Sequence, residues 1–307
     1  MATRPPLLAL VGPTACGKTD AGIVLARSLG AEICSVDSML VYRGMDIGTA
    51  KPTNEQRARV PHHLVDLAEP SERFTVARYQ AAGREAIERL RARNVEPLLV
   101  GGSGLYFRAL ADELVFPGED STVRAELEAE ADAVGIGRLF RRLEELDPVA
   151  AAKIEPRNVR RVVRALEVTA ITGAPFSSFA AGWERYDPTR VLVAGIAIQA
   201  EVLAARIADR VAAMFAAGWL DEVRGLEERG FGAWLTATQA IGYAELVRHL
   251  DGRLSLEEAW EGTVRRTKNL ARRQMAWFRR DPRVRWFEAG AGGAIEVVDD
   301  VRVFLEP

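Results

Sequence analysis

The sequence predicts an α/β fold in which a parallel sheet is flanked by helices and interrupted by a helical insertion. Strand-like and helix-like segments alternate over the first hundred residues, and the alternation stops between about residues 117 and 187. A glycine-rich loop also separates the first strand from the first helix, as in many α/β proteins that bind phosphate. A chain of 307 residues, 48% hydrophobic and 27% charged, is neither disordered nor collagen-like.

The strands predicted in the first hundred residues are apolar along nearly their whole length. They are Leu7–Val11, Glu32–Val36 and Pro97–Val100. Helical spacing of apolar residues predicts helices over Lys18–Leu29 and Tyr79–Arg93, between those strands. Because strands of a parallel sheet are covered on both faces, continuous apolar runs separated by helices indicate such a sheet.

The middle of the chain has helical periodicity and no convincing strand. Helices are expected over Thr122–Val134, Gly137–Leu146 and Asn158–Thr172, and Val191–Ile198 then returns the chain to the sheet. We therefore expect a catalytic core formed by residues 1–116 and 188–307, with a helical insertion domain at 117–187. From Glu201 to about Arg280 the pattern is helical again, and its expected breaks are at glycines. These are Gly218, Gly230 and Gly242.

Composition restricts the compartment and the kind of site. Cys16 and Cys34 are too few for a disulfide framework or a four-cysteine zinc site. His62 and His63 are adjacent in a strand-like stretch, so they point to opposite faces and suit a metal pair badly. With no apolar run long enough to cross a bilayer and no cleavable leader, we expect a cytoplasmic protein with no membrane contact.

The first motif with a chemical meaning matches G-x-x-x-x-G-K-[ST] between a buried strand and a helix. We call it the phosphate loop; it consists of Gly12, Pro13, Thr14, Ala15, Cys16, Gly17, Lys18 and Thr19. Its backbone amides and the helix N-terminus attract phosphate oxygens, Lys18 adds a positive charge, and the Thr19 hydroxyl can ligate Mg²⁺. The loop indicates a P-loop NTPase-like core that binds a di- or triphosphate, but it leaves open which bond is broken. Cys16 fills a variable position and is given no chemical role.

Two polar residues follow other strands of the predicted sheet. Asp37 comes directly after Glu32–Val36, and Ser103 follows Pro97–Val100 within a glycine-rich corner. Ligands of open α/β sheets bind at the carboxyl ends of the strands, so both side chains should lie near the phosphate loop. Asp37 can ligate a metal, accept a proton or simply cap the following turn.

Seven segments, in this order, resemble the tRNA dimethylallyltransferase family, also called tRNA isopentenyltransferases. The segments are GPTACGKT at 12–19, SVDSMLVYRGMDIGTAKP at 35–52, PHHLVD at 61–66, LLVGGSGLYFRAL at 98–110, LDPVAAAKIEPRNVRRVVRALEV at 146–168, QAIGY at 239–243 and RTKNLARRQMAWFRR at 266–280. The resemblance covers most of the chain, and its specificity lies in the conjunction, since many proteins carry the first segment alone.

The resemblance implies an enzyme that moves a dimethylallyl group from dimethylallyl diphosphate to the N6 amine of the adenosine 3′-adjacent to the tRNA anticodon. The catalytic residues would be Lys18, Asp37, which would face the amine, and Ser103, which would add a second polar contact. The phosphate loop would bind the diphosphate, with Mg²⁺ on Thr19. Arg210 is a candidate for clamping the diphosphate. A monomer without an obligate protein partner is expected.

The resemblance also implies contacts to the tRNA anticodon stem-loop. The candidates are Asp37, Ser38, Met39, Leu40, Ser103, Arg160, Arg161, Val162, Val163, Arg164, Arg272 and Arg273. The sequence departs from the family where Ser103 replaces the usual Thr, Leu40 a common Gln, and Ala276 a Thr; Lys268-Asn269-Leu270 is also atypical. Ser103 keeps the hydroxyl, whereas Leu40 removes any hydrogen bond to a base at that position.

Local clusters of positive charge support the RNA contact, but the net charge of the chain does not. The chain has 41 Lys and Arg against 43 Asp and Glu, a net charge of −2, without the basic excess usual in RNA-binding proteins. However, Arg157, Arg160, Arg161 and Arg164 have the spacing of one helix face, and positive charges dominate residues 265–285. Because this chain uses Arg almost everywhere, such clusters can also be solvated helix faces. Lysine is rare, so Lys51 in the GTAKP segment is a further candidate without an assigned role.

Three other functions share some of these features. A small-molecule kinase would hold ATP in the same loop. A prenyltransferase acting on AMP or ADP would need neither the basic clusters nor the long insertion. A non-catalytic RNA-binding module would leave the phosphate loop and Asp37 without a purpose.

Overall fold

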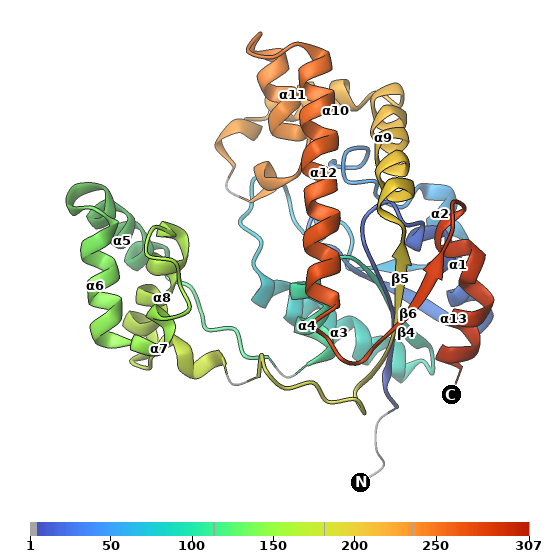
Figure 1. Cartoon of the computed structure of the whole chain (residues 1–307), viewed down its shortest axis with the longest axis horizontal. Coiled ribbons are helices and arrows are strands. Elements are labelled where there is room, and N and C mark those ends of the chain that lie inside the picture. Colours follow the sequence, from blue (N-terminus) through green and yellow to red (C-terminus); the bar gives the residue numbers. More distant parts are fainter. Residues whose placement is uncertain (1–4, 113, 181, 235, 307) are drawn as a thin grey trace. The chain divides into compact units, whose positions relative to one another are not determined.

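The computed structural model describes residues 5–112, 114–180, 182–234 and 236–306 (Figure 1). Its centre is a six-stranded sheet in the order β3-β2-β4-β1-β5-β6, with every neighbouring pair parallel. The strands are β1 (Leu7–Val11), β2 (Ala31–Val36), β3 (His62–His63), β4 (Glu96–Gly101), β5 (Val191–Ile198) and β6 (Val284–Ala289). The predicted α/β fold with a parallel sheet flanked by helices is confirmed.

Among the described residues outside the insertion, eight α-helices precede β6 and pack around this sheet or beside it. They are α1 (Lys18–Leu29), α2 (Asn54–Arg59), α3 (Val76–Ala92), α4 (Gly104–Ala111), α9 (Ala200–Ala216), α10 (Trp219–Glu227), α11 (Tyr243–Leu250) and α12 (Leu256–Phe278). A last helix, α13 (Val298–Leu305), follows the 3-10 turn η4 (Gly293–Val297).

The two faces of the sheet are covered by different helices (Figure 1). Every residue of β1 is buried, and alternate residues face opposite sides, because successive side chains of a strand alternate. Leu8 and Leu10 join an apolar cluster with α1 and α13. Across the sheet, α3 packs on β2 and β4, and its Tyr79 hydroxyl donates to the Ser35 carbonyl at 2.7 Å.

The sequence underestimates the sheet by two strands. It predicts four, whereas β3 and β6 extend the sheet at its two edges. β3 has only two residues, too few for a periodic pattern. β6 contains both buried and exposed residues, and its Arg285 and Glu288 are exposed, as charged residues of an edge strand are. In the sequence, these charges make the segment resemble the end of the preceding basic helix.

The helical stretch after β5 breaks at the expected glycines. Gly218, Gly230 and Gly242 have φ angles of 92°, 90° and 91°. Gly218 and Gly242 directly precede α10 and α11, where a residue with a side chain would be strained. The breaks turn the stretch into α9, α10, α11 and the long α12.

The chain divides into two compact units, Met1–Ala111 with Asp187–Pro307, and Asp112–Tyr186. The second unit contains α5 (Ser121–Val134), α6 (Ile136–Leu146), α7 (Pro148–Ala151) and α8 (Val159–Thr172), and no strand in its described residues. It begins before residue 117, because Phe116 makes an edge-on ring contact with Trp183, at 6.1 Å between centroids. Its own core is formed around Leu139, Leu143 and Val162.

Candidate active site

Three strands of the sheet end at the same level and present the candidate polar residues there. Val11 of β1 and Val36 of β2 both pair with Gly101 of β4. The phosphate loop follows β1, Asp37 follows β2, and Ser103 lies two residues beyond β4. The parallel register therefore brings all three to one edge of the sheet, as the spacing in the sequence predicts.

The phosphate loop curls because several of its residues have positive φ angles. Gly12, Ala15 and Gly17 have φ angles of 155°, 64° and 90°. A Cβ at Gly12 would lie 3.0 Å from the Ile196 carbonyl oxygen, so β5 leaves no room for a larger residue. Lys18 Nζ donates across the loop to the Pro13 carbonyl at 2.5 Å. Cys16 is completely buried, consistent with a filler that is given no chemical role.

Residues distant in sequence hold the loop from outside. Gln274 of α12 accepts a hydrogen bond from the Thr14 amide at 2.8 Å. Arg206 of α9 donates from Nε to the Ala15 carbonyl at 2.8 Å, and from Nη1 to the Ala291 carbonyl at 2.7 Å. The Ala294 amide donates to the Cys16 carbonyl at 2.8 Å. Neither Arg206 nor Gln274 is among the residues predicted from the sequence, although Gln274 stands within a segment that carries the family resemblance.

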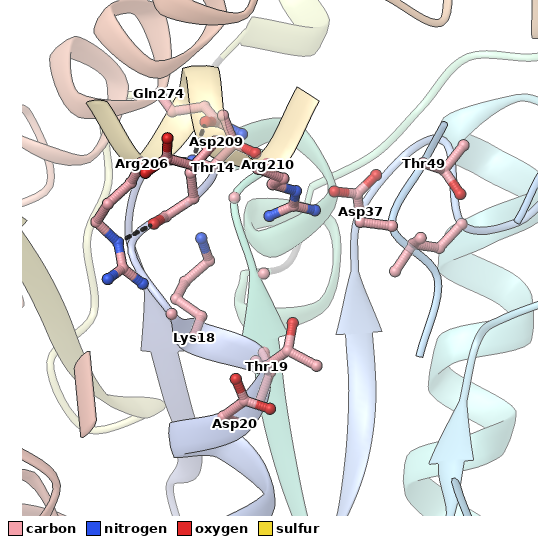
Figure 2. A pocket seen from close by; sticks show the side chains of 17 residues that line it. Thr14, Lys18, Thr19, Asp20, Asp37, Thr49, Arg206, Asp209, Arg210 and Gln274 are labelled. Atoms are coloured by element: carbon pink, nitrogen blue, oxygen red, sulfur yellow. Dashed lines mark hydrogen bonds between the residues drawn. The ribbon is translucent and has the colours of Figure 1, made fainter. Parts of the chain in front are cut away.

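Above the loop lies a cavity of about 380 Å³ with mixed charge (Figure 2). Its lining includes Lys18, Thr19, Asp37 and Arg210, together with Leu40. In Figure 2 the Arg210 guanidinium points toward the Asp37 carboxylate from the opposite wall. The cavity lining therefore combines three cations, Lys18, Arg206 and Arg210, with three carboxylates, Asp20, Asp37 and Asp209.

Arg210 and Asp37 differ in how much of their hydrogen-bonding capacity is already used. Among the described residues, no hydrogen bond or ion pair joins Arg210 to another group. Burial lowers the pKa of its guanidinium, while the nearby charge of Asp37 acts in the opposite direction. Asp37 Oδ1 accepts from the Met39 amide at 2.9 Å, which orients the carboxylate. The cap predicted as an alternative for Asp37 is present, and Asp37 lines the cavity as well.

A second, larger cavity of about 720 Å³ adjoins the first. The two share Thr14, Asp37, Thr49, Gly102, Arg210 and Gln274 in their linings. The larger one is also lined by Ser38, Met39 and Ser103, and by one face of α12 from Thr263 to Trp277. Asp37 thus stands where a small charged chamber opens into a wider and more apolar one.

The glycine-rich corner after β4 allows α12 to approach this edge closely. A Cβ at Gly102 would overlap Nε2 of Gln274, and one at Gly104 would overlap the Trp277 ring. A side chain at Gly102 would displace the Gln274 amide, and one at Gly104 would displace the Trp277 ring. The corner therefore positions Ser103 and also admits the helix that forms one wall of the larger cavity.

The segment between Asp37 and α2 is fixed by two hydrogen-bond networks. Lys51 donates to the Tyr42 carbonyl at 2.5 Å, to Asp46 at 2.5 Å and to Asp66 at 2.7 Å. These bonds use all three of its N–H donors, so Lys51 has a structural role. The Glu222 carboxylate of α10 accepts from the Asp46, Ile47 and Gly48 amides at 2.8, 2.7 and 3.3 Å.

The arginines expected on one face of the insertion have different environments. Arg157 precedes Asn158, the N-cap of α8, so it lies outside the helix. Arg160 and Arg161 are exposed. Arg164 already has partners within the insertion. It donates to the Gly118 and Pro117 carbonyls at 3.0 and 2.8 Å, and to buried Glu167 at 2.9 Å.

Val162 and Val163 do not present side chains for tRNA binding. Both are buried in the core of the insertion, with exposed fractions of 0% and 2%. The prediction that they contact RNA is therefore wrong for their side chains. They are the apolar face that holds α8 against α5 and α6.

The basic residues of α12 lie at the second cavity and outside it. Arg272 and Arg273 are both exposed, and Arg273 also lines the larger cavity. Of the nearby aromatics, Phe278 is fully buried, whereas Trp277 is 40% exposed at the rim of that cavity.

The adjacent histidines His62 and His63 each have a neighbour within hydrogen-bond distance. His63 Nε2 lies 2.7 Å from Glu32, and His62 Nδ1 lies 2.8 Å from the Val60 carbonyl. Among the described residues, no group of three or more His, Cys, Asp or Glu side chains could hold a metal ion. No helix in the described ranges is long and apolar enough to span a membrane.

Known families match almost the whole chain. A family model described as IPP transferase matches residues 40–281, and one described as isopentenyl transferase matches residues 5–69. The tRNA dimethylallyltransferase of Streptomyces coelicolor is 48% identical over 301 residues, 97% of this chain and 96% of the relative. That of Kineococcus radiotolerans is 50% identical over 307 residues, with 98% and 96% covered.

Solved structures agree with the sequence comparison. A tRNA isopentenylpyrophosphate transferase from Bacillus halodurans aligns over 98% of this chain and 95% of its own, with a TM-score of 0.71 and 40% identity. A eukaryotic dimethylallyltransferase acting on tRNA aligns over 98% of this chain and 78% of its own, with a TM-score of 0.83 and 25% identity.

Proposed function

Because the chain belongs to the IPP transferase family of tRNA dimethylallyltransferases, we propose the reaction of that family for it. It transfers a dimethylallyl group from dimethylallyl diphosphate to the N6 amine of the adenosine 3′-adjacent to the tRNA anticodon, and releases diphosphate. The observation that carries this proposal is the position of Asp37 between the phosphate-loop chamber and the wider cavity.

The smaller chamber suits a diphosphate leaving group. Loop amides, the positive end of α1 and the ammonium of Lys18 favour negative oxygens there. Arg210, which has no other hydrogen-bonding partner among the described residues, can donate to the same oxygens from the opposite wall. Charge that develops on the departing diphosphate is thus stabilised in a partly buried site, where electrostatic attraction is stronger than in water.

The residues at the loop also fit a magnesium ion. Mg²⁺ prefers hard oxygen ligands and keeps few protein contacts when a substrate supplies phosphate oxygens. The Thr19 hydroxyl lies at the chamber and would hold the ion, with the diphosphate as the other main ligand. Bound there, the ion supplies positive charge to the leaving group.

Asp37 acts on the adenine. Its carboxylate accepts a hydrogen bond from the N6 amine and orients the nitrogen lone pair toward the allylic carbon. The C–N bond forms as the C–O bond to diphosphate breaks, and the proton leaves N6 for Asp37. The Ser103 hydroxyl adds a polar contact in the wider cavity. The target base is stacked in an anticodon loop, so it must be flipped out to enter this cavity.

The wider cavity and the exposed arginines support tRNA as the acceptor in preference to a mononucleotide. Ser38, Met39, Ser103 and Arg273 line that cavity, and Leu40 lines the smaller one. Arg160, Arg161 and Arg272 are exposed and suit phosphates of the anticodon stem-loop. As a tRNA-modifying enzyme, the protein is expected to act in the cytoplasm as a monomer, without an obligate protein partner.

One labelling experiment separates this function from a kinase. The protein is incubated with Mg²⁺, unmodified tRNA and dimethylallyl diphosphate labelled in the prenyl carbons, and in parallel with ATP labelled in the γ-phosphate. Nucleoside analysis should find the prenyl label on N6 of adenosine in tRNA. Transfer of the γ-phosphate to a product, with no prenyl label in RNA, would contradict the proposal. A third incubation also contains AMP. Prenyl label on AMP but not on tRNA would favour a mononucleotide prenyltransferase.

A further inference from the structure

Gln274, which is not among the site residues predicted from the sequence, stands at the junction of both cavities. It is part of the lining of the phosphate-loop chamber and of the larger cavity. On α12 it belongs to a stripe with Leu270, Arg273 and Trp277, at spacings of three and four residues. All members of that stripe line the larger cavity.

The Gln274 side chain bridges two strand ends. Its Oε1 accepts from the Thr14 amide at 2.8 Å, as the dashed line in Figure 2 marks. The Thr14 N–H can only donate, so the amide oxygen must face the loop and the NH₂ group must face the other way. There Nε2 occupies the space that a Cβ at Gly102 would need. Gln274 is thus wedged between the phosphate loop after β1 and the corner after β4.

The same helix carries part of the candidate RNA surface. Arg272 and Arg273, immediately before Gln274, are exposed, and Trp277 packs its ring on Gly104. The helix is continuous from Leu256 to Phe278 and starts with a capping box in which Ser255 and Glu258 bond each other's backbone amides. One regular helix therefore connects the exposed arginines with the side chain that holds Thr14.

We propose that Gln274 is a positioning residue that couples tRNA binding on α12 to diphosphate binding at the phosphate loop. The inference rests on the proposed function, because it needs both substrates. RNA on Arg272 and Arg273 restrains α12, and α12 then holds the Thr14 arm of the loop through Gln274. A diphosphate that binds afterwards has less loop freedom to remove, which gives positive cooperativity without a large structural change.

Thermodynamic linkage gives this coupling a measurable form. If bound RNA tightens diphosphate binding by some factor, bound diphosphate must tighten RNA binding by the same factor. We expect a factor of about five in the wild type, at the lower end of coupling between sites. Loss of a side chain with a purely structural role would change the affinity for each ligand. The ratio of that affinity with the other ligand present to that with it absent would stay the same.

The test measures binding by calorimetry, without turnover. The probes are an anticodon stem-loop RNA and a dimethylallyl thiolodiphosphate, in which sulfur replaces the bridging oxygen. Each Kd is measured with and without the other probe for the wild type, Gln274→Leu and Gln274→Glu. Gln274→Leu removes the acceptor for Thr14 at similar volume. Gln274→Glu retains an acceptor and adds a negative charge beside the loop. Gln199→Leu, at an exposed position that makes no capping bond to α9, is the matched control.

The expected results differ in pattern. Wild type and Gln199→Leu keep the fivefold coupling, and Gln274→Leu reduces it to about onefold while its RNA Kd in the absence of diphosphate stays within about twofold. Gln274→Glu weakens diphosphate binding but keeps coupling. If the coupling survives in Gln274→Leu, the inference is overturned. If the wild type also transfers labelled prenyl carbon to RNA, the proposed function is retained. A wild type that binds both probes independently also overturns the inference. A wild type that neither binds the probes nor transfers the label overturns both.

Discussion

The sheet-edge chamber and the helical insertion both contain arginines and carboxylates, but they use them in opposite ways. In the chamber, Arg210 makes no hydrogen bond or ion pair within the described chain, and Asp37 accepts the Met39 amide. In the insertion, Arg124 and Arg164 both donate to Glu167, whose side chain is completely buried. Both regions bring arginine and carboxylate together. What distinguishes a site from a scaffold is whether the structure has already supplied the partners.

The sharpest way to test this difference is to remove the cation of the phosphate loop. Lys18→Met should lower kcat/KM for prenyl diphosphate by about 10³-fold, since deleting a preorganised charge at a developing negative charge costs about that much. The lysine is replaced by an apolar group of similar length. Lys153→Met, at an exposed residue of the insertion paired with Glu184, is the control and should keep wild-type rates. Similar losses in the two variants would contradict the assignment of Lys18.

Arg210 tests whether an unpartnered cation in the chamber contributes to catalysis. Arg210→Gln should reduce kcat/KM for prenyl diphosphate by roughly 30-fold, about 2 kcal/mol, because a hydrogen bond to a charged group is lost. Steady-state kinetics at saturating tRNA measure the effect. Unfolding midpoints should not fall, since no described hydrogen bond or ion pair of Arg210 is broken. A stability loss with unchanged kinetics would assign Arg210 to the scaffold.

Glu167 is the corresponding test in the insertion. Burial raises its pKa, but hydrogen bonds from Arg124, Arg164 and the Asp120 amide outweigh that effect, so the net pKa is lowered. Glu167→Gln leaves two arginines without their charge partner and should destabilise the insertion by about 3 kcal/mol. Urea unfolding followed by Trp183 fluorescence would measure this. Lys153→Gln, which breaks an exposed pair, should cost under about 0.5 kcal/mol.

The same carboxylate gives the insertion a defined acid sensitivity. A group whose folded-state pKa is lowered stabilises the fold above its unfolded-state pKa, and this contribution is lost as pH falls through the folded-state value. Stability of the wild-type insertion should therefore decline on acidification below the ordinary glutamate pKa of about 4.3, and stability of the Glu167→Gln variant should decline less. Parallel acid titrations of both proteins would contradict the role assigned to Glu167.

The smallest expected effect concerns exposed arginines. Arg160→Ala with Arg161→Ala should weaken tRNA binding several-fold and reduce the salt slope of log Kd by roughly 1.5, if each contacts one phosphate. Arg138→Ala, at an exposed arginine of α6, is the control and should leave the slope unchanged. An unchanged slope in the double variant would remove this end of α8 from the RNA surface. Arg164 is unsuitable for this test, because its loss would also break contacts within the insertion.

The sequence predicts those site residues that follow strands in a local pattern. Lys18, Asp37 and Ser103 each lie within a few residues of a strand end, and parallel register brings strand ends together. Gln274 and Arg206 contact the loop from 260 and 191 residues away, and helical periodicity indicates a face without indicating its neighbour. For the same reason, the spacing of Arg164 predicts the helix face on which it lies. The spacing does not predict that Arg164 donates to Glu167 and to the Pro117 and Gly118 carbonyls.

Fold prediction fails where the local signal is short or mixed. The core strands are continuous apolar runs and are predictable for that reason, whereas β3 has two residues and β6 contains two charged residues among its apolar ones. Gly102 and Gly104 resemble an ordinary turn in the sequence, but the structure needs them because α12 approaches closely. That reason is tertiary, so no window of sequence around the glycines contains it.

The most direct measurement is the single-turnover rate of the Asp37→Asn protein with both substrates already bound. The amide is isosteric with the carboxylate and cannot take the N6 proton, so the rate of prenyl transfer should fall by at least about 100-fold. The Kd values for tRNA and for prenyl diphosphate should stay within about threefold of wild type, because the Asn oxygen still accepts from the amine and other groups make the remaining contacts. A chemical rate within a few-fold of wild type would contradict proton transfer to Asp37.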